Sequence, residues 1–326
     1  MLRTLLGAAA GLALTASVGV AQEKMRISLQ LPLKSHLGQN LVLFEQEVES
    51  RTGGAIDVEI YDSATLYKDK EVPAAVGSGA IEAGVASLTR YVGDAPVVDV
   101  FYMPFLFNSE DKVRAAVTEG SVVRQTIEAE IEKTGGQVLY WQAYGGAIML
   151  SNGGPIRTPS DMEGKKVRVF GKTLGDFVKA AGGAPTLISG SEQYLAYQRG
   201  TVDVGMTGVS GVKSRKLWEV MDTITVTNHA DIEFVVVVNN DWWNGLSEEI
   251  RGHIAEAAAV AQGSVRDKMA SIEAEAYAAA KENGMTVVEL TDDELEQWKA
   301  VSQPVYDAYL AAAGEAGQKV LTAAGN

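Results

Sequence analysis

RTPSDMEGKKVRVF, residues 157–170, tells most about how this chain folds. Its first half is polar and predicts a turn, and its second half predicts a short β-strand. Because neighbouring side chains on a strand point to opposite faces, Val167 and Val169 can face a core while Arg168 points the other way. Two interpretations of the strand stay open. Arg168 lies on a solvated face of a sheet, or its planar set of donors binds a carboxylate.

Alternating strands and helices lie on both sides of this segment. Before it, apolar residues repeat with period two in predicted strands and with helical spacing in predicted helices. The predicted strands are residues 25–31, 56–60, 81–86, 138–141 and 147–150, and the predicted helices are 37–48, 72–76 and 121–133. After it, the pattern restarts with strands at 167–169 and 202–206 and helices at 174–181 and 192–199. Two such blocks predict an α/β fold with two lobes.

Residues 247–283 form the longest predicted helix, because they contain no proline and are rich in helix-forming residues. Ser247 can cap its start, and Gly284 can cap its end. At a rise of 1.5 Å per residue the helix would be about 55 Å long. That length exceeds one lobe, so we expect the helix to run along both. The alternative is two shorter helices that are broken near Gly252 or Gly263.

The composition excludes several classes of function. The chain has 326 residues, a net charge of −14 and no cysteine. Without cysteine, disulfides, thiolate metal sites and a cysteine nucleophile are excluded. The lysines and arginines are scattered, so the chain is a poor candidate for binding nucleic acid or an anionic membrane surface. An anionic ligand would have to be held by local groups against the overall field, which favours an arginine that faces inward.

The first 21 residues have the three parts of a secretory signal peptide. Arg3 supplies the charged start, residues 5–20 are uncharged and mostly apolar, and Gly19–Ala21 offers small residues at the exit. We therefore predict a signal peptide at residues 1–21, cleaved after Ala21, and a soluble mature protein in the periplasm. The alternative is an N-terminal membrane anchor, although the apolar run is shorter than the roughly 20 residues that a span needs.

The sequence contains no recognisable set of catalytic or cofactor-binding residues. The histidines His36, His229 and His253 are far apart, and none has a second metal ligand at the spacing of zinc sites. No G-x-S-x-G nucleophile elbow, P-loop or dinucleotide-binding fingerprint is present. We therefore predict a protein that is not an enzyme and that needs no metal or cofactor.

Five segments, in order along the chain, resemble the substrate-binding subunits of tripartite ATP-independent periplasmic (TRAP) transporters of the dicarboxylate-binding type. Each segment is weakly specific alone, but together they cover nearly the whole predicted mature chain. The segments are LYKDKE at residues 66–71, MPFLF at 103–107, RTPSDMEGKKVRV at 157–169, TNH at 227–229 and VVNNDWW with a following leucine at 237–246.

The resemblance implies a bilobal periplasmic binding protein fold, with a ligand cleft between two α/β lobes and a long helix that spans both. It also implies that the arginine after the R-T-P turn, which is Arg168 here, binds the carboxylate of the ligand. We assign residues 22–144 and 233–270 to lobe I, and residues 145–232 and 271–326 to lobe II.

At three positions the chain departs from what the resemblance implies for the cleft. Thr207 stands where the family usually has an asparagine that reaches the ligand, and Gly190 stands where it often has a phenylalanine. Ala147 stands where the sialic-acid binders of the family carry a second arginine, so sialic acid is disfavoured. These departures predict a cleft with fewer polar groups than usual, suited to a monocarboxylate of low polarity.

Other residues are candidates for the cleft because of their places in the predicted elements. Phe170 lies two residues after Arg168 and so shares its face of the strand. Tyr144 and Trp141 could supply apolar bulk, although core packing is an equal alternative for Trp141. Ser87 fits a cleft position on a strand of lobe I. His36 lies in the first strand-to-helix loop, a common place for ligand contacts.

From this resemblance we expect a solute-binding protein that captures a small organic acid and delivers it to the membrane permease of a TRAP transporter. The expected partners are the carboxylate ligand and the permease subunits, without nucleic acid and without insertion of the mature monomer into the membrane. One alternative is a periplasmic sensor or chemoreceptor accessory with the same fold. An exported enzyme is a weaker alternative, because no acid/base pair or metal set is visible.

Overall fold

The computed structural model describes residues 22–325, and the predicted signal peptide with its cleavage site lies outside this range. Lobe I contains the strands β1 (Glu23–Ser28), β2 (Ile56–Tyr61) and β3 (Ala83–Ser87). Its helices are α1 (His36–Arg51), α2 (Val72–Gly77), α3 (Glu110–Val117), α4 (Val122–Glu132) and α8 (Asn240–Gly245). Three short 3₁₀ turns, η1 (Asp69–Glu71), η2 (Leu88–Tyr91) and η3 (Pro96–Tyr102), connect these elements.

Lobe II repeats the alternation of strands and helices. Its strands are β5 (Lys166–Val169), β6 (Ala184–Leu187), β7 (Val204–Gly208), β8 (Thr223–Val226) and β10 (Thr286–Glu289). Its helices are α5 (Lys172–Ala180), α6 (Gln193–Gln198), α7 (Val209–Arg215) and α10 (Asp292–Ala300), and the C-terminal helix α11 (Gln303–Gly325), which is kinked at Gly314, follows. The 3₁₀ turns η4 (Pro159–Met162), η5 (Gly190–Glu192) and η6 (Leu217–Glu219) complete it.

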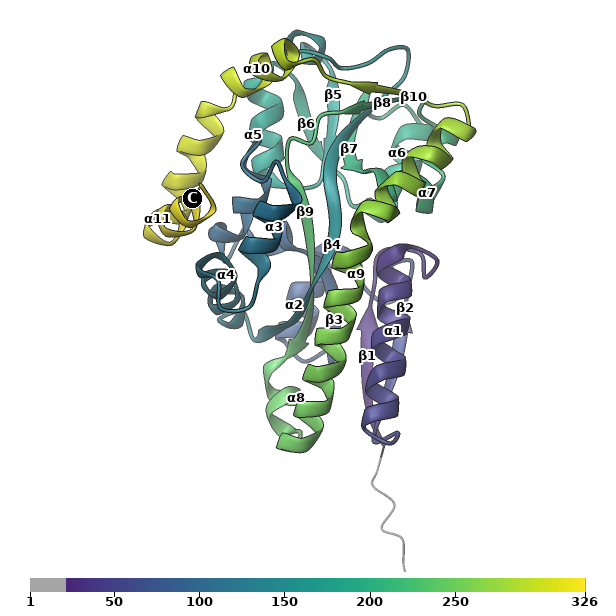
Figure 1. The fold of residues 1–326 in the computed structure, drawn as a ribbon, viewed down its shortest axis with the longest axis vertical. Coiled ribbons are helices and arrows are strands. Elements are labelled where there is room, and N and C mark those ends of the chain that lie inside the picture. Colours follow the sequence, from purple (N-terminus) through teal and green to yellow (C-terminus); the bar gives the residue numbers. More distant parts are fainter. Residues whose placement is uncertain (1–21, 326) are drawn as a thin grey trace, which may run out of the picture.

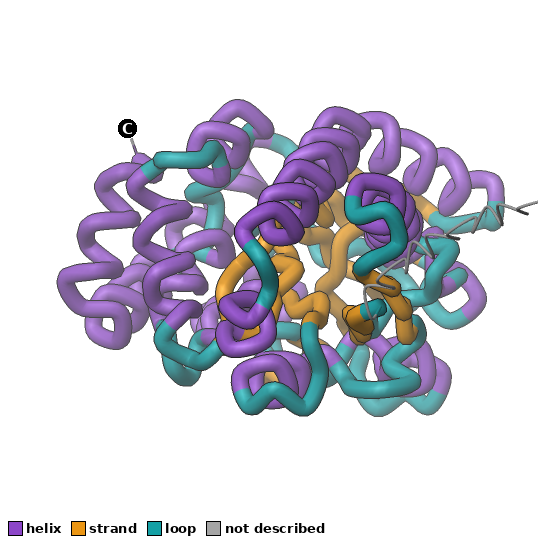
Figure 2. The backbone as a smooth tube through the Cα atoms, turned by 90° about the horizontal axis from the view of Figure 1, so that it is seen from below, coloured by secondary structure: helices purple, strands orange, loops and turns teal. Residues whose placement is uncertain are grey.

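Two long strands, β4 (Gly136–Ser151) and β9 (Asp231–Asn239), join the lobes into one sheet. Within the described residues the strand order is β2-β1-β3-β9-β4-β7-β5-β6, with β8 paired to β4 and β10 paired to β8. Figure 2 shows these strands in the interior and the helices around them. The two-lobed α/β architecture predicted from the sequence is therefore confirmed.

β4 corrects one detail of the sequence-based prediction. Residues 138–141 and 147–150, expected as separate strands, belong to this one strand. Its first part pairs with β9, and its last residues pair with β7 and β8. The register shifts between Ala143 and Gly145, where Gly145 has a φ of 97°. A bulge with a glycine at positive φ bends a strand without ending it, which lets β4 pass from lobe I into lobe II.

The longest helix, α9 (Glu248–Glu282), is continuous over 35 residues, so the alternative of two broken helices is wrong. Ser247 caps its start, as expected, by accepting a hydrogen bond from the backbone N of Ile250 at 3.2 Å. α9 packs against α1 in lobe I, against α7 in lobe II and against β4 between them. Figure 1 shows it crossing both halves of the molecule.

The C-terminal helix α11 lies beside elements of both lobes. It packs against η3 and α4 of lobe I and against α5 of lobe II, and Figure 1 shows it on the side of the molecule away from α1. The assignment of residues 271–326 to lobe II, and the other lobe boundaries, stay predictions. Among residues 22–325 no helix combines the length and the apolar character that a membrane span requires.

Candidate functional site

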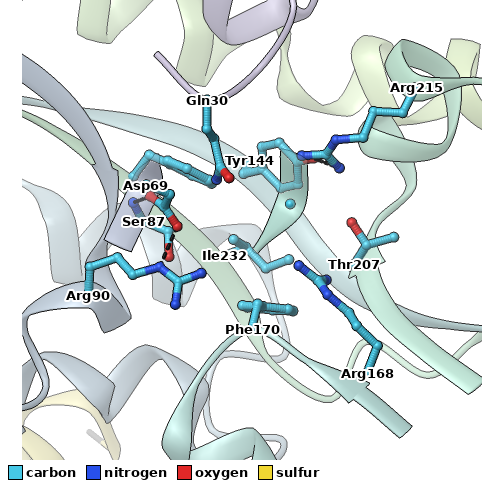
Figure 3. Close-up of a pocket in the computed structure, with 12 residues that line it drawn as sticks. Gln30, Asp69, Ser87, Arg90, Tyr144, Arg168, Phe170, Thr207, Arg215 and Ile232 are labelled. Carbon is cyan, nitrogen blue, oxygen red and sulfur yellow. Dashed lines mark hydrogen bonds and ion pairs between the residues drawn. The ribbon is translucent and has the colours of Figure 1, made fainter. Parts of the chain in front are cut away.

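A small cavity lies where the lobes meet, and Figure 3 shows the side chains that surround it. The volume open to a water-sized probe is about 20 Å³, roughly the room for one water molecule. The twelve lining residues come from lobe I, from lobe II and from the strands that join them. They are Gln30, Asp69, Ser87, Arg90, Tyr144, Arg168, Phe170, Gly190, Thr207, Arg215, Ile232 and Phe234.

Most of these residues lie at or just after the carboxyl ends of strands. Ser87 ends β3, Phe170 follows β5, and Thr207 is the last residue but one of β7. The loops that leave the carboxyl ends of such strands gather at one edge of a sheet, which is the usual place for a ligand in α/β proteins. Because β4 and β9 run between the lobes, they bring the two edges face to face around the cavity.

Arg168 is oriented as the sequence pattern predicts. Val167 and Val169 are buried in the core of the lobe, and Arg168 itself is 3 % exposed and points into the cavity. Its Nε donates a hydrogen bond to the carbonyl oxygen of Ile188 at 3.0 Å, and its Nη1 donates to that of Met206. Carbonyl groups orient the guanidinium but carry no opposite charge.

No carboxylate within residues 22–325 forms an ion pair with Arg168. Burial lowers the pKa of Arg168 to about 10, and the positive charges of Arg215 and Arg90 add to this effect. A buried cation without a counterion is unfavourable, so the site favours binding of an anion. The guanidinium carbon lies 5.3 Å from the centre of the Phe170 ring, a cation–π geometry that also holds it in place.

Arg90 differs from Arg168 because a carboxylate already compensates its charge. Asp69 forms a buried ion pair with the Nε of Arg90, and the two side chains are 0 % and 7 % exposed. The second oxygen of Asp69, Oδ1, accepts a hydrogen bond from the backbone N of Ser87 at 2.9 Å. Asp69 therefore connects η1, β3 and η2 next to the cavity, and the Arg90–Asp69 pair as a whole carries no net charge.

Arg215 is the third arginine of the cavity and comes from the end of α7. Its Nη1 donates to Oε1 of Gln193 at 3.1 Å and makes a longer contact of 3.4 Å with the hydroxyl of Tyr144. In the part of the chain that the structure describes, Arg215 has no ion pair. Three arginines and one aspartate thus line the cavity, which gives it a formal charge of +2 in a chain whose net charge is −14.

Six of the eight residues predicted from the sequence line this cavity. They are Arg168, Phe170, Thr207, Ser87, Tyr144 and Gly190. The polar lining differs from the expected cleft of low polarity, because three arginines converge on it. Trp141 lies elsewhere, fully buried in the core, where its Nε1 donates to Oε1 of Glu128 at 2.8 Å.

Ala147 and His36 do not line this cavity, and their roles in ligand binding stay predictions. Ala147 is fully buried and pairs with Gly208 across β4 and β7. The His36 ring packs against the Tyr144 ring at a centroid distance of 5.3 Å. Burial lowers the pKa of His36 to about 4, and its Nε2 lies 3.1 Å from the carbonyl oxygen of Ala143.

Sequence reasoning missed Gln30, Asp69, Arg90 and Arg215. Arg90 follows Ser87 by three residues, so the rule that ligands gather at the carboxyl ends of strands could have indicated it. Arg215 offered no such signal, because it stands among Lys213 and Lys216 on a helix whose orientation depends on packing.

Comparison with protein families agrees with this geometry. A family model described as bacterial extracellular solute-binding protein, family 7, matches residues 27–312. The C4-dicarboxylate-binding periplasmic protein DctP of Rhodobacter capsulatus is 32% identical over 274 residues, which are 83% of this chain and 81% of the relative.

Solved structures of similar proteins share the whole fold. A TRAP periplasmic solute-binding protein from Shewanella oneidensis with bound succinate has a TM-score of 0.87 and 26% identity, and the match covers 94% of this chain and 99% of that one. DctP7 of Bordetella pertussis, an extracytoplasmic solute receptor binding pyroglutamic acid, has a TM-score of 0.88 and 20% identity, with coverage of 93% and 99%. The second likeness, at this identity, concerns the fold alone.

Proposed function

The chain belongs to family 7 of the bacterial extracellular solute-binding proteins, and from this premise we propose that it captures a small organic acid between its lobes and delivers it to a TRAP permease. The observation that carries the proposal is Arg168, a buried guanidinium that faces the cavity between the lobes and has no carboxylate partner among residues 22–325. An organic acid supplies the missing charge.

Capture requires that the lobes separate and close, because residues from both lobes enclose the cavity. A carboxylate then accepts charge-assisted hydrogen bonds from Arg168, each of which contributes roughly 1.5–3 kcal/mol. Phe170, Ile232 and Phe234 supply apolar contact for the carbon skeleton. The remaining affinity comes from excluding water when the lobes close, which strengthens the ionic contact.

The relatives named as periplasmic proteins support the same compartment for this chain. A signal peptide cleaved after Ala21 remains a prediction, which mass spectrometry of the exported protein tests. The expected mature protein begins at Gln22. Delivery to the permease is tested by uptake of a bound acid into vesicles that contain TRAP membrane subunits, with and without this protein.

A thermal-shift screen across small organic acids tests the capture step. A ligand at 100 times its Kd adds about 2.7 kcal/mol to the free energy of unfolding. We expect Arg168→Ala to lose this stabilisation, because truncating one partner of a buried charge pair costs roughly 2–5 kcal/mol. Arg168→Lys should restore binding only in part, since lysine lacks the bidentate fork.

Arg199→Ala is the matched control, because Arg199 is an exposed arginine of the same lobe outside the cavity. It should bind like the wild type. If Arg168→Ala keeps the affinity of the wild type for an acid that the screen identifies, Arg168 does not hold the carboxylate. If no acid stabilises the wild type, the proposed capture of organic acids is wrong.

A further inference from the structure

We propose that a second hollow between the lobes, which we call the basic vestibule, is the route by which an acid enters and leaves the cavity. This inference rests on the proposed function, because it assumes that the cavity captures an acid. The volume open to a water-sized probe is about 330 Å³ in the vestibule, against about 20 Å³ in the cavity around Arg168. Figure 1 shows the three helices around the vestibule, α1, α7 and α9, next to one another. The vestibule is lined by residues 34–36, where α1 begins, by Ser210, Lys213 and Ser214 of α7, and by Ile272 and Glu275 of α9.

One wall separates the basic vestibule from the cavity, and the Tyr144 ring is at its centre. Tyr144 lines the cavity, and the His36 ring, which lines the vestibule, packs against it at a centroid distance of 5.3 Å. The hydroxyl of Ser210 in the vestibule donates to the carbonyl oxygen of Tyr144 at 3.3 Å. Figure 3 shows Tyr144 and Arg215 together on one side of the cavity, and Arg215 directly follows Ser214 of the vestibule. The two hollows therefore share this wall.

The Tyr144 ring fits closely against lobe II. A Cβ atom on Gly208 would lie 2.9 Å from Cδ1 of this ring, and a Cβ atom on Gly211 would lie 2.5 Å from its hydroxyl oxygen. Glycine at these two positions, at the end of β7 and in α7, therefore leaves the space that the ring occupies. The other side of the wall, His36, begins α1 of lobe I. Separation of the lobes thus divides the wall between Tyr144 and His36 and joins the two hollows.

The lobes can separate at the basic vestibule without loss of a polar contact. Among residues 22–325, no hydrogen bond or ion pair joins residues 33–36 to α7. At another edge of the interface between the lobes, the ion pair of Lys68 with Glu192 has to break before a ligand can pass. The vestibule is therefore the side on which opening costs fewer polar contacts.

The charge of the basic vestibule suits an anionic ligand. Lys34 is exposed and forms no ion pair with any residue that the structure describes, and Lys213 forms an exposed pair with Glu275 at 2.9 Å. Two lysines and one glutamate give the lining a formal charge of +1, and Arg215 continues the positive charge into the cavity. In a chain whose net charge is −14, a locally positive entrance raises the concentration of an anion there and its rate of association.

Stopped-flow measurement of association and dissociation tests the role of this charge. The probe is the tightest-binding acid of a panel of succinate, pyroglutamate and butyrate. At about 10 mM salt, where the Debye length is about 30 Å, Lys34→Glu should slow association by about three- to tenfold. It should change the dissociation rate by less than about twofold, because Lys34 does not touch the bound acid. At about 1 M salt, where the Debye length is about 3 Å, the difference should disappear.

Lys281→Glu is the matched control, because Lys281 is an exposed lysine in the last turn of α9, away from the basic vestibule. It changes the net charge of the protein by the same amount as Lys34→Glu. It should slow association by less than about twofold at low salt. Thermal melting of the ligand-free variants checks that each one is folded.

Ser214→Trp tests the route itself, because a tryptophan side chain at this position would occupy the basic vestibule. An obstacle on the only route of a ligand slows entry and exit alike, so association and dissociation should both slow, by roughly fivefold or more. The Kd should then stay within about twofold of the wild-type value. An acid that uses another edge of the interface would leave both rates as they are in the wild type.

Four results would overturn the inference. Lys34→Glu could associate at the wild-type rate at low salt, its effect could persist at high salt, or Lys281→Glu could slow association as strongly. Ser214→Trp could leave both rates unchanged or change the Kd without slowing association. If the wild type binds an acid of the panel and any of these results is found, the proposed function stands and only the route is lost. If the wild type binds no acid of the panel or of the thermal-shift screen, both fall together.

Discussion

At the scale of single residues, Asp99 joins the two lobes through one carboxylate. It lies fully buried in η3 of lobe I, and its Oδ2 accepts hydrogen bonds from Oγ1 (2.7 Å) and the backbone N (3.3 Å) of Thr173 in lobe II. Thr173 belongs to the first turn of α5, whose own N-cap is Gly171 and has no side chain to offer. Asp99 therefore supplies the carboxylate that a helix N-terminus favours.

Burial raises the pKa of Asp99 to about 6, although the hydrogen bonds from Thr173 oppose this shift. Because the folded-state pKa lies above the ordinary value of 3.8, the stability from this group is present below about pH 4 and is lost as the pH rises to about 6. We expect Asp99→Asn to remove this loss. As the pH rises from about 4 to 6.5, the free energy of unfolding of the variant minus that of the wild type should increase by on the order of 1–3 kcal/mol.

Urea unfolding of both proteins at stepped pH measures this difference. Other buried carboxylates with raised pKa values, such as Glu233 and Glu273, titrate in both proteins. Their contribution therefore cancels when the two curves are subtracted. A difference that stays flat over this pH range, or that moves in favour of the wild type, would contradict the assignment to Asp99.

At the scale of elements, α9 contains two glycines that contribute nothing to its packing. Gly252 and Gly263 are exposed, and a Cβ at either position would meet no atom within 4 Å. Glycine in a helix interior costs about 1 kcal/mol relative to alanine. Gly252→Ala and Gly263→Ala should therefore each raise the free energy of unfolding by up to about 1 kcal/mol, and their effects should add.

Chemical denaturation measures the free energies of unfolding of these two variants. Gly145→Ala in β4 is the contrasting variant for that measurement. At a φ of 97°, its added Cβ would lie 2.2 Å from Oε1 of Glu273, so both strain and overlap oppose it. It should destabilise the protein, in contrast to the two helix variants. If Gly252→Ala or Gly263→Ala also destabilised the protein, α9 would not be a regular helix at that position.

At the scale of the whole molecule, an ion pair bridges the two lobes beside the cavity. Nζ of Lys68 in lobe I lies 2.8 Å from Oε1 of Glu192 in lobe II, and the side chains are 41% and 46% exposed. Such exposed pairs add little to folding stability because water and salt screen them. Because its two residues lie in different lobes, separation of the lobes would break this pair, so we assign its effect to closure.

We expect Lys68→Met to raise the dissociation rate of a bound acid by a factor of about 2 to 5, and to leave unfolding of the ligand-free protein unchanged. Stopped-flow dissociation at low and high salt measures this, and salt should diminish the effect. Glu192→Gln should behave alike, and the double variant should add nothing further if the two residues act as a pair. Additive effects would show that each residue acts alone.

Local patterns in the sequence predicted much of the fold. The orientation of Arg168 follows from the period of two in β5, and the continuity of α9 follows from a proline-free run with a serine cap. These features depend on neighbours in the chain, so periodicity and capping report them directly. The order of five motifs along the chain identified the family, and the family match confirms it.

What the sequence by itself determined is therefore many of the helices and strands, the two-lobed architecture and the one arginine that a strand directs inward. Only the tertiary structure decided that Arg90 and Arg215 join Arg168, and that Ala147 and His36 stay outside. The physical reason is that these placements depend on how distant segments pack. The bulge at Gly145 sets where β4 crosses between the lobes, and the path of β4 sets which side chains from each lobe converge on the cavity.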